Sequence, residues 1–250
     1  CVCSFFFLEK GLIAANYVSV FVTIFYIMYI CNIKFPSKSN DLTRDEKKKI
    51  IKFSTVCVIN NSTSTIMYLL DTFVLGIVVA NSAVTASYKV ASKIPTALSF
   101  IPGCVMTYIY PYFARHKNDG KWCLRNYKKV LLLLGLVSVG GLIIFAPTVI
   151  KIVFGKQYLD ALIPFRLLCL NYIVQATFAT ISGQLIVSQE RLGFNTFTGI
   201  FSSVLNTILN LVLIPKLSSI GAALATLTVT IVVSVLNTIF FVKILRAKIK

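Results

Sequence analysis

The sequence predicts an all-α protein, a polytopic membrane helix bundle with about seven transmembrane helices. Three observations support this fold class. The chain of 250 residues is 57% hydrophobic and only 13% charged, with a mean hydropathy of +0.83, whereas soluble domains carry about 25% charged residues. Its apolar residues form segments of roughly 20 residues or more, the length that spans the hydrocarbon core of a bilayer. Its basic residues concentrate in the short connections between these segments.

Seven apolar segments account for most of the chain when hydropathy is averaged over windows of about 19 residues. They cover residues 11–33, 53–79, 84–113, 130–150, 162–187, 194–214 and 220–242. Residues typical of turns separate them: Pro36 with Ser37, Asn81 with Ser82, Asn118 to Gly120, Gly155, Arg191 to Gly193, and Pro215 with Ser218 and Ser219. Residues 2–30 lack the basic start and the cleavage site of a signal peptide, so we interpret this stretch as a membrane helix.

The cysteines indicate neither a disulfide framework nor a metal site. There are seven of them, an odd number, and most lie scattered within apolar segments. Free cysteine in such surroundings behaves as a small buried hydrophobic residue.

The distribution of lysine and arginine predicts the orientation in the membrane. Of the 25 basic residues, 18 lie in alternate connections, namely residues 34–52, residues 113–129, Arg191 and the tail from Lys243. Because cytoplasmic loops carry an excess of basic residues, we expect these connections and the C-terminus in the cytoplasm. The net charge of +17 is spread over short loops, which favours anionic lipid headgroups over nucleic acid as its counterpart.

One acidic residue, Asp71, lies inside an apolar segment. Steps of three and four residues from Asn60 lead through Ser64 and Tyr68 to Asp71, so these residues form one polar stripe on a helix. Charges inside hydrocarbon cost several kcal/mol and mark transport paths. The other charged residues within segments are Lys89, Lys93 and Arg166.

We therefore predict a substrate pathway formed by Asp71, Lys89, Lys93, Arg166, Asn60 and Tyr68. Two alternatives remain open at this point. The amide side chains within the segments, including Asn206 and Asn210, are equally suited to hydrogen bonds between helices. Arg166 is also placed to extend its side chain to the membrane interface.

The spacing of charges around one turn predicts an ion pair. Asp71 lies eleven residues before Ser82 and Lys93 lies eleven residues after it, which places both about 16 Å from the turn in an antiparallel hairpin. We expect Asp71 to pair with Lys93 or, as the second choice, with Lys89, either as a gate or as a structural pair.

An enzyme is not predicted, because no acid, base and nucleophile gather within one segment. The single histidine, His116, lies in a basic loop, and no second carboxylate accompanies Asp71. We therefore predict no catalytic residue, no metal site and no bound cofactor. Coupling to a proton or sodium gradient is expected if Asp71 titrates.

Five stretches resemble a known family in their order and spacing. They read DTFVLG from residue 71, YKVASK from residue 88, FGKQYLDA from residue 154, NTILNLVLIP from residue 206 and GAALAT from residue 221. Across residues 50–242 they resemble the oligosaccharide flippases that export O-antigen, capsule and teichoic-acid repeat units. Ser218 departs from the family, which commonly has glycine there, so the tightness of that turn is in question.

The resemblance implies the domain organisation. Its superfamily, the multidrug/oligosaccharidyl-lipid/polysaccharide exporters, has two six-helix lobes around a cavity that opens alternately to each side. By comparison, residues 1–33 would hold the last helix of the first lobe, residues 34–52 a basic cytoplasmic loop between lobes, and residues 53–250 the six-helix C-terminal lobe. We interpret the chain as a piece whose N-terminal part is missing.

The resemblance also implies the substrate, an undecaprenyl-diphosphate-linked oligosaccharide in the bacterial cytoplasmic membrane, with glycan polymerase machinery as a further partner. Lys89, Lys93 and Arg166 would then offset the diphosphate. Two other functions compete with it. A cation or drug antiporter of the same superfamily should show acids along the cavity, and a membrane enzyme of glycan assembly such as a polymerase should show a long outer loop.

Overall fold

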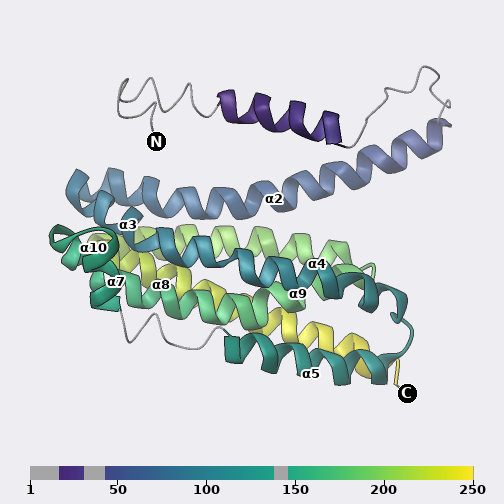
Figure 1. The fold of residues 1–250 in the computed structure, drawn as a ribbon. Helices are drawn as coiled ribbons and strands as arrows, with labels where there is room; N and C mark the ends of the chain where they lie inside the picture. Colours follow the sequence, from purple (N-terminus) through teal and green to yellow (C-terminus); the bar gives the residue numbers. More distant parts are fainter. Residues whose placement is uncertain (1–16, 31–42, 138–145, 250) are drawn as a thin grey trace. The chain divides into compact units, whose positions relative to one another are not determined.

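The computed structural model describes residues 17–30, 43–137 and 146–249 (Figure 1). The chain divides into two compact units, Cys1–Ile51 and Lys52–Lys250. The first unit contains the apolar helix Tyr17–Ile30. The candidate site lies wholly within the second unit.

The described residues confirm the predicted all-α class. The helices are α2 (Arg44–Val79), α3 (Ser82–Leu98), α4 (Phe100–Arg115), α5 (Gly120–Val137), α7 (Ala146–Val153), the 3₁₀ turn η1 (Lys156–Ala161), α8 (Leu162–Val174), the π-helical turn η2 (Gln175–Ala179), α9 (Thr180–Ser188) and α10 (Leu192–Ala247). Three stretches are long and apolar enough to cross a membrane, namely Ser82–Arg115, Tyr158–Ser188 and Leu192–Ala247. Part of the predicted segment 130–150 lies outside the described residues.

Helix α2 begins earlier than the sequence analysis predicted. Residues 44–52 of the expected loop 34–52 are helical, because Thr43 and Glu46 form a capping box. The Thr43 backbone N–H and its Oγ1 donate to Glu46 Oε2 at 2.9 and 2.8 Å. These hydrogen bonds hold the pKa of Glu46 below its ordinary value. The cap is therefore present above that ordinary pKa and weakens as the pH falls through the lowered one.

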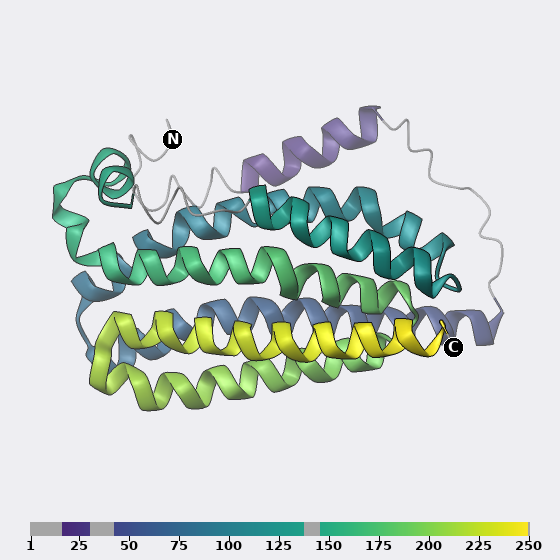
Figure 2. The ribbon, with the colours of Figure 1, turned by 90° about the horizontal axis from the view of Figure 1, so that it is seen from below.

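Helix α10 is two antiparallel helices joined at Ser218, where φ is 52° and ψ is −131°. Figure 2 shows the two halves, light green and yellow, running side by side. Phe194 in the first half stacks on Phe240 in the second, with ring centroids 3.6 Å apart. The predicted break between residues 214 and 220 is therefore confirmed, and it forms a tight hairpin.

We expect Ser218→Gly to stabilise the protein by about 1 kcal/mol or more, because a residue with a side chain is strained at this positive φ and glycine is not. Thermal unfolding of the full chain in detergent, followed by the fluorescence of Trp122, would measure the change. Ser219→Gly is the matched control, since glycine at a helical position costs about 1 kcal/mol. Equal destabilisation by both substitutions would contradict the strain at Ser218.

Two apolar clusters support the second unit. One joins Leu75, Ala91, Ile150, Phe165 and Ala222, from α2, α3, α7, α8 and α10. The second cluster lies among α4, α5, α9 and α10. It comprises Met106, Phe113, Cys123, Tyr127, Val130, Leu134, Ile181, Leu185, Ile186, Phe241 and Leu245. Large apolar side chains also cover outward faces of the helices, as a hydrocarbon environment allows.

Polar contacts connect the loops at one end of the helix bundle. We call this end the basic end, and it consists of residues 116–119, residues 189–191 and Lys248. Lys117 Nζ lies 2.6 Å from Glu190 Oε1. Lys248 Nζ donates to the Lys117 carbonyl and to Gln189 Oε1, both at 2.6 Å. The hydrogen bond from Lys117 lowers the pKa of Glu190. These contacts join the α4–α5 loop, the α9–α10 loop and the end of α10.

Candidate functional site

The carboxylate of Asp71 lies in the interior of the second unit. The residue is 2% exposed, and its neighbours on α2, Val74 and Leu75, are also buried. Asp71 Oδ1 accepts a hydrogen bond from Asn210 Nδ2 at 2.6 Å. Asp71 Oδ2 lies 2.5 Å from Thr226 Oγ1 and accepts from the Tyr88 hydroxyl at 3.2 Å. The carboxylate therefore contacts α3 and both halves of α10.

Further hydrogen bonds orient the side chains that contact Asp71. Asn210 Nδ2 also donates to Asn206 Oδ1 at 2.9 Å, one helical turn away. Thr226 Oγ1 lies 3.1 Å from the Ala222 carbonyl, again one turn away. Asn210 and Thr226 are each eight residues from Ser218, so the hairpin of α10 places them at one level, about 12 Å from its turn. We call Asp71, Tyr88, Asn206, Asn210 and Thr226 the Asp71 cluster.

The predicted ion pair of Asp71 with Lys93 or Lys89 is wrong. Among the residues that the structure describes, the partners of Asp71 are neutral, and the one ion pair is Lys117 with Glu190. Lys89 and Lys93 are both exposed. Counting residues from the turn predicted how far along α3 each lysine lies, but it did not predict the direction in which its side chain points from the helix axis. Tyr88, Ala91 and Pro95 form the buried face of α3. Lys89 is turned about 100° from Tyr88 around the helix axis, and Lys93 lies on nearly the opposite side from the buried face.

The Asp71 cluster contains buried polar atoms that lack a partner. Asn206 Nδ2 and Asn210 Oδ1 have none within the part of the chain that the structure describes. Both residues are fully buried. A buried polar group without a hydrogen bond costs about 1–3 kcal/mol. The Asn210 carbonyl oxygen therefore favours an additional donor or cation beside the carboxylate, whereas the Asn206 amide N–H requires an acceptor, which a water molecule can supply. A carboxylate, amide carbonyls and hydroxyls form an oxygen-rich set that suits a proton, a water molecule or a small hard cation.

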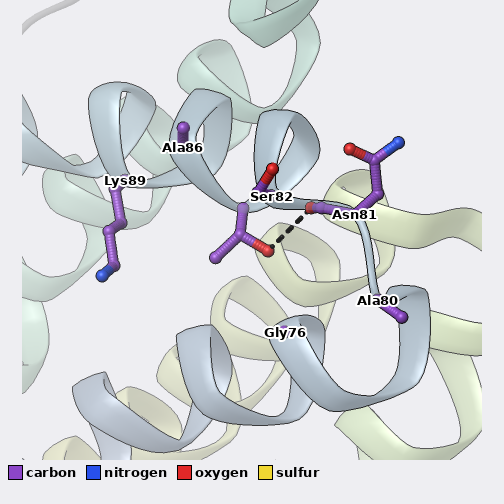
Figure 3. A pocket seen from close by; sticks show the side chains of 7 residues that line it. Gly76, Ala80, Asn81, Ser82, Ala86 and Lys89 are labelled. Carbon is purple, nitrogen blue, oxygen red and sulfur yellow. Dashed lines mark hydrogen bonds between the residues drawn. The ribbon is translucent and has the colours of Figure 1, made fainter.

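Lys89 lies instead at a pocket beside the turn between α2 and α3 (Figure 3). The pocket has a volume of about 590 Å³ and is lined by Gly76, Ala80, Asn81, Ser82, Thr85, Ala86 and Lys89. Asn81 caps α3, because its Oδ1 accepts from the backbone N–H of Ala83 at 3.0 Å. The pocket thus combines the N-terminus of a helix with a lysine side chain.

Two other predicted pathway residues, Lys93 and Arg166, lie outside both the Asp71 cluster and the pocket. Arg166 is exposed on α8, and Lys93 is exposed on α3 without lining the pocket. Asn60 and Tyr68 belong to α2, but their side chains lie outside the described part of the chain. Of the four predicted residues whose side chains the structure describes, Asp71 belongs to the Asp71 cluster and the other three are exposed.

Sequence reasoning did not give Tyr88 and Thr226 a role, and it left the amides Asn206 and Asn210 undecided between cavity lining and helix contact. A signal was present in the spacing. Asn206 and Asn210 are four residues apart, as are Ala222 and Thr226, on either side of a turn. Placing both pairs on facing sides of a hairpin would have indicated a common site.

The helix arrangement is similar to that of two solved transporters of the MOP superfamily. One similar structure is a MOP superfamily transporter from Pyrococcus furiosus whose binding pocket is described as having reverse polarity, with a TM-score of 0.61 and 17% identity. Another is an outward-facing multidrug resistance transporter of the MATE family, with a TM-score of 0.60 and 18% identity. Each similarity covers 78% of this chain and 44% of the other.

The sequence comparison shows the family. The model of the polysaccharide biosynthesis protein family matches residues 10–163, and the chain belongs to this family. A protein of Haloferax volcanii named as a probable low-salt glycan biosynthesis flippase is 24% identical over 184 residues. The match covers 72% of this chain and 39% of that protein, so the chain spans less than half the length of the relatives it matches.

Proposed function

We propose that this chain forms part of a transporter that flips undecaprenyl-diphosphate-linked oligosaccharides across the bacterial cytoplasmic membrane for polysaccharide biosynthesis. Alternating access between two lobes would move the glycan while the lipid tail stays in the bilayer. The match to the polysaccharide biosynthesis family, together with a relative named as a glycan biosynthesis flippase, supports this substrate class. Transport of a bound molecule requires no catalytic residue in this chain.

The observation that carries the mechanism is the neutral surroundings of Asp71. An ionised carboxylate buried in a membrane bundle is costly unless a positive charge neutralises it. The described partners of Asp71 supply hydrogen bonds but no charge. A proton or a sodium ion would supply that charge, so we propose that Asp71 is the site where a cation gradient drives transport.

Binding of a cation would also alter the packing of the bundle. Asp71 connects α2 and α3 to both halves of α10, which lie 139 and 155 residues further along the chain at Asn210 and Thr226. A cation that binds one arrangement of these helices more tightly than another shifts the population toward it. The coupling would thus act through the relative positions of α2 and the α10 hairpin.

The direct test is transport by the full-length protein in proteoliposomes that contain a fluorescent lipid-linked oligosaccharide. We expect the glycan to move across the membrane, and we expect a proton or sodium gradient to accelerate this movement. Movement of organic cations without movement of the glycan would instead support the antiporter function, and movement that no gradient affects would overturn the coupling.

The pocket beside Lys89 is the proposed contact for the diphosphate. The exposed Lys93 and Arg166 are proposed as further contacts. We expect Lys89→Ala to slow glycan transport about tenfold or more, because a hydrogen bond to a charged group contributes roughly 1.5–3 kcal/mol. Lys89→Arg should retain most of the rate. Lys216→Ala, which removes an exposed lysine near another turn, is the matched control. An unchanged rate for Lys89→Ala at normal membrane levels would remove Lys89 from the pathway.

The proposed orientation places the basic end and the C-terminus in the cytoplasm. In a cysteine-free full chain, we expect a cysteine at position 48 or 121 to react with an impermeant maleimide only from the cytoplasmic side. A cysteine at position 82 or 218 should react only from outside. Labelling of intact cells and of inverted vesicles distinguishes the sides, and the reverse pattern would reject the orientation.

A further inference from the structure

A second buried polar cluster lies among α5, α9 and α10, in the half of the unit that leads toward the basic end. The Tyr127 hydroxyl lies 2.8 Å from Ser182 Oγ. Ser182 Oγ in turn lies 3.1 Å from Thr238 Oγ1. Tyr127 and Ser182 are buried, so three hydroxyl groups meet inside an otherwise apolar part of the bundle.

Two amides extend this second cluster. A side chain added at Gly183 would place its Cβ 3.3 Å from Asn195 Oδ1 and 3.5 Å from Asn237 Nδ2. The absence of a side chain at Gly183 therefore lets both amides approach α9. Asn195 lies four residues after Arg191, about 6 Å along the helix from the basic end.

A polar stripe on α10 connects the Asp71 cluster with the second cluster. It consists of Thr226, Thr230, Ser234 and Asn237, whose spacing of four, four and three residues places them on one helix face. All four are buried, with exposed fractions of 1%, 6%, 4% and 3%. Thr226 contacts Asp71, and Asn237 precedes Thr238 of the second cluster. The stripe extends about 16 Å, since each helical residue rises 1.5 Å.

Several buried polar atoms on α10 and on helices packed against it lack a hydrogen-bond partner within the described residues. They include Ser234 Oγ and Asn237 Oδ1 on α10, Thr177 Oγ1 in η2 and Asn171 Oδ1 on α8. Both η2 and α8 pack against α10. Inside a membrane such groups are costly, and buried water is their usual partner. Thr177 lies in a π-helical turn, a local irregularity that often accompanies function.

We propose that the stripe holds a file of water molecules that connects Asp71 with the basic end, and that the coupling cation passes along it. This inference rests on the proposed cation site at Asp71. The hydroxyl and amide groups can pass a proton along hydrogen bonds, and their oxygens can solvate a sodium ion. None of the four stripe side chains carries a charge that would trap the ion on the way.

The presence of water can be measured without transport. In a cysteine-free full chain in membrane vesicles, Ser234→Cys should react with silver ions, which fit a narrow aqueous path, and not with a bulky methanethiosulfonate reagent. Protection from later maleimide labelling after denaturation reports the reaction. Val235→Cys is the matched control, because Val235 is the next residue and is 51% exposed on the apolar surface.

Three results would decide the matter. Reaction of Ser234→Cys with silver ions from the basic side alone, with no reaction of Val235→Cys, supports the water file. No reaction at position 234 overturns it. Reaction with both the silver ions and the bulky reagent also overturns it, because it would indicate a wide cavity in place of a file.

Passage of the cation is tested with Ser234→Val in proteoliposomes. The expected result is transport about tenfold slower under the gradient that drives it, the effect of one lost hydrogen bond on a rate, with the half-saturating cation concentration unchanged. Val235→Thr should transport normally. Sodium-only and proton-only gradients identify the ion. Normal transport by Ser234→Val would show that the cation does not pass along the stripe, even if silver ions react at position 234. The proposed cation site at Asp71 is tested separately with Asp71→Asn.

Discussion

The Asp71→Asn variant is expected to reach the membrane at normal levels and to lose gradient-driven transport by a factor of about 100 or more. Asparagine keeps the size of the side chain and an oxygen that can accept from Asn210, but it cannot carry the negative charge that binds a cation. Loss of a buried charge interaction costs on the order of 3 kcal/mol or more, and each 1.4 kcal/mol is about tenfold in rate. The measurement is initial transport in proteoliposomes with a sodium gradient, a proton gradient or neither.

The control for this variant is Asp160→Asn, which makes the same change at an exposed carboxylate in η1. It should transport as the unmodified protein does. Asp71→Asn should retain at most a slow rate that no gradient changes. If instead a gradient accelerates Asp71→Asn as strongly as it does the control, Asp71 is not the coupling site.

The Gly221→Ala substitution is expected to destabilise the hairpin of α10 and to stop transport. A Cβ at residue 221 would collide with the Leu213 carbonyl oxygen, and it would lie 2.6 Å from the Leu213 carbonyl carbon and 3.0 Å from Ile214 N. These are backbone atoms, so relief requires the two halves of α10 to separate. Overpacking of this kind typically costs 1–3 kcal/mol. Separation of the halves would also move Thr226 relative to Asn210, the two residues that hold Asp71 from opposite sides.

Thermal unfolding and transport of the full chain would measure both effects of Gly221→Ala. Gly103→Ala in α4 is the matched control, because no atom outside its own helix neighbourhood lies within 4 Å of the added Cβ. There alanine should stabilise the helix by up to about 1 kcal/mol. Equal unfolding temperatures for the two variants would show that the hairpin tolerates a wider spacing at residue 221.

Much of the fold could be predicted from the sequence, because helix formation in a membrane depends on the residues within each segment. A backbone in hydrocarbon must satisfy its own hydrogen bonds, so long apolar segments become helices. The turns at Asn81 with Ser82 and near Ser218 were readable from residue types that favour such conformations. The unusual position of Asp71 could be recognised as well, because a single carboxylate inside an apolar segment is costly wherever that segment lies in the membrane.

The hydrogen-bond partners of Asp71 could not be predicted from the sequence, because they depend on contacts between segments that are distant along the chain. Asn210 and Thr226 follow Asp71 by 139 and 155 residues, and no local propensity records such a distance. The same limit explains the mistaken pair with Lys93: residue counts fix how far along a helix a side chain lies, whereas packing against other helices fixes which way it turns.

What the sequence by itself determined is therefore an all-α membrane bundle, its breaks, and the one acidic residue that its interior must accommodate. Only the tertiary structure decided which side chains contact Asp71. Helix α3 directs Tyr88 toward Asp71 and both lysines away from it. The hairpin at Ser218 brings the two halves of α10 to the carboxylate. The reason is physical. Burial and helix formation are set by each segment's own composition, but the neutralisation of a buried charge depends on which faces of distant helices pack together.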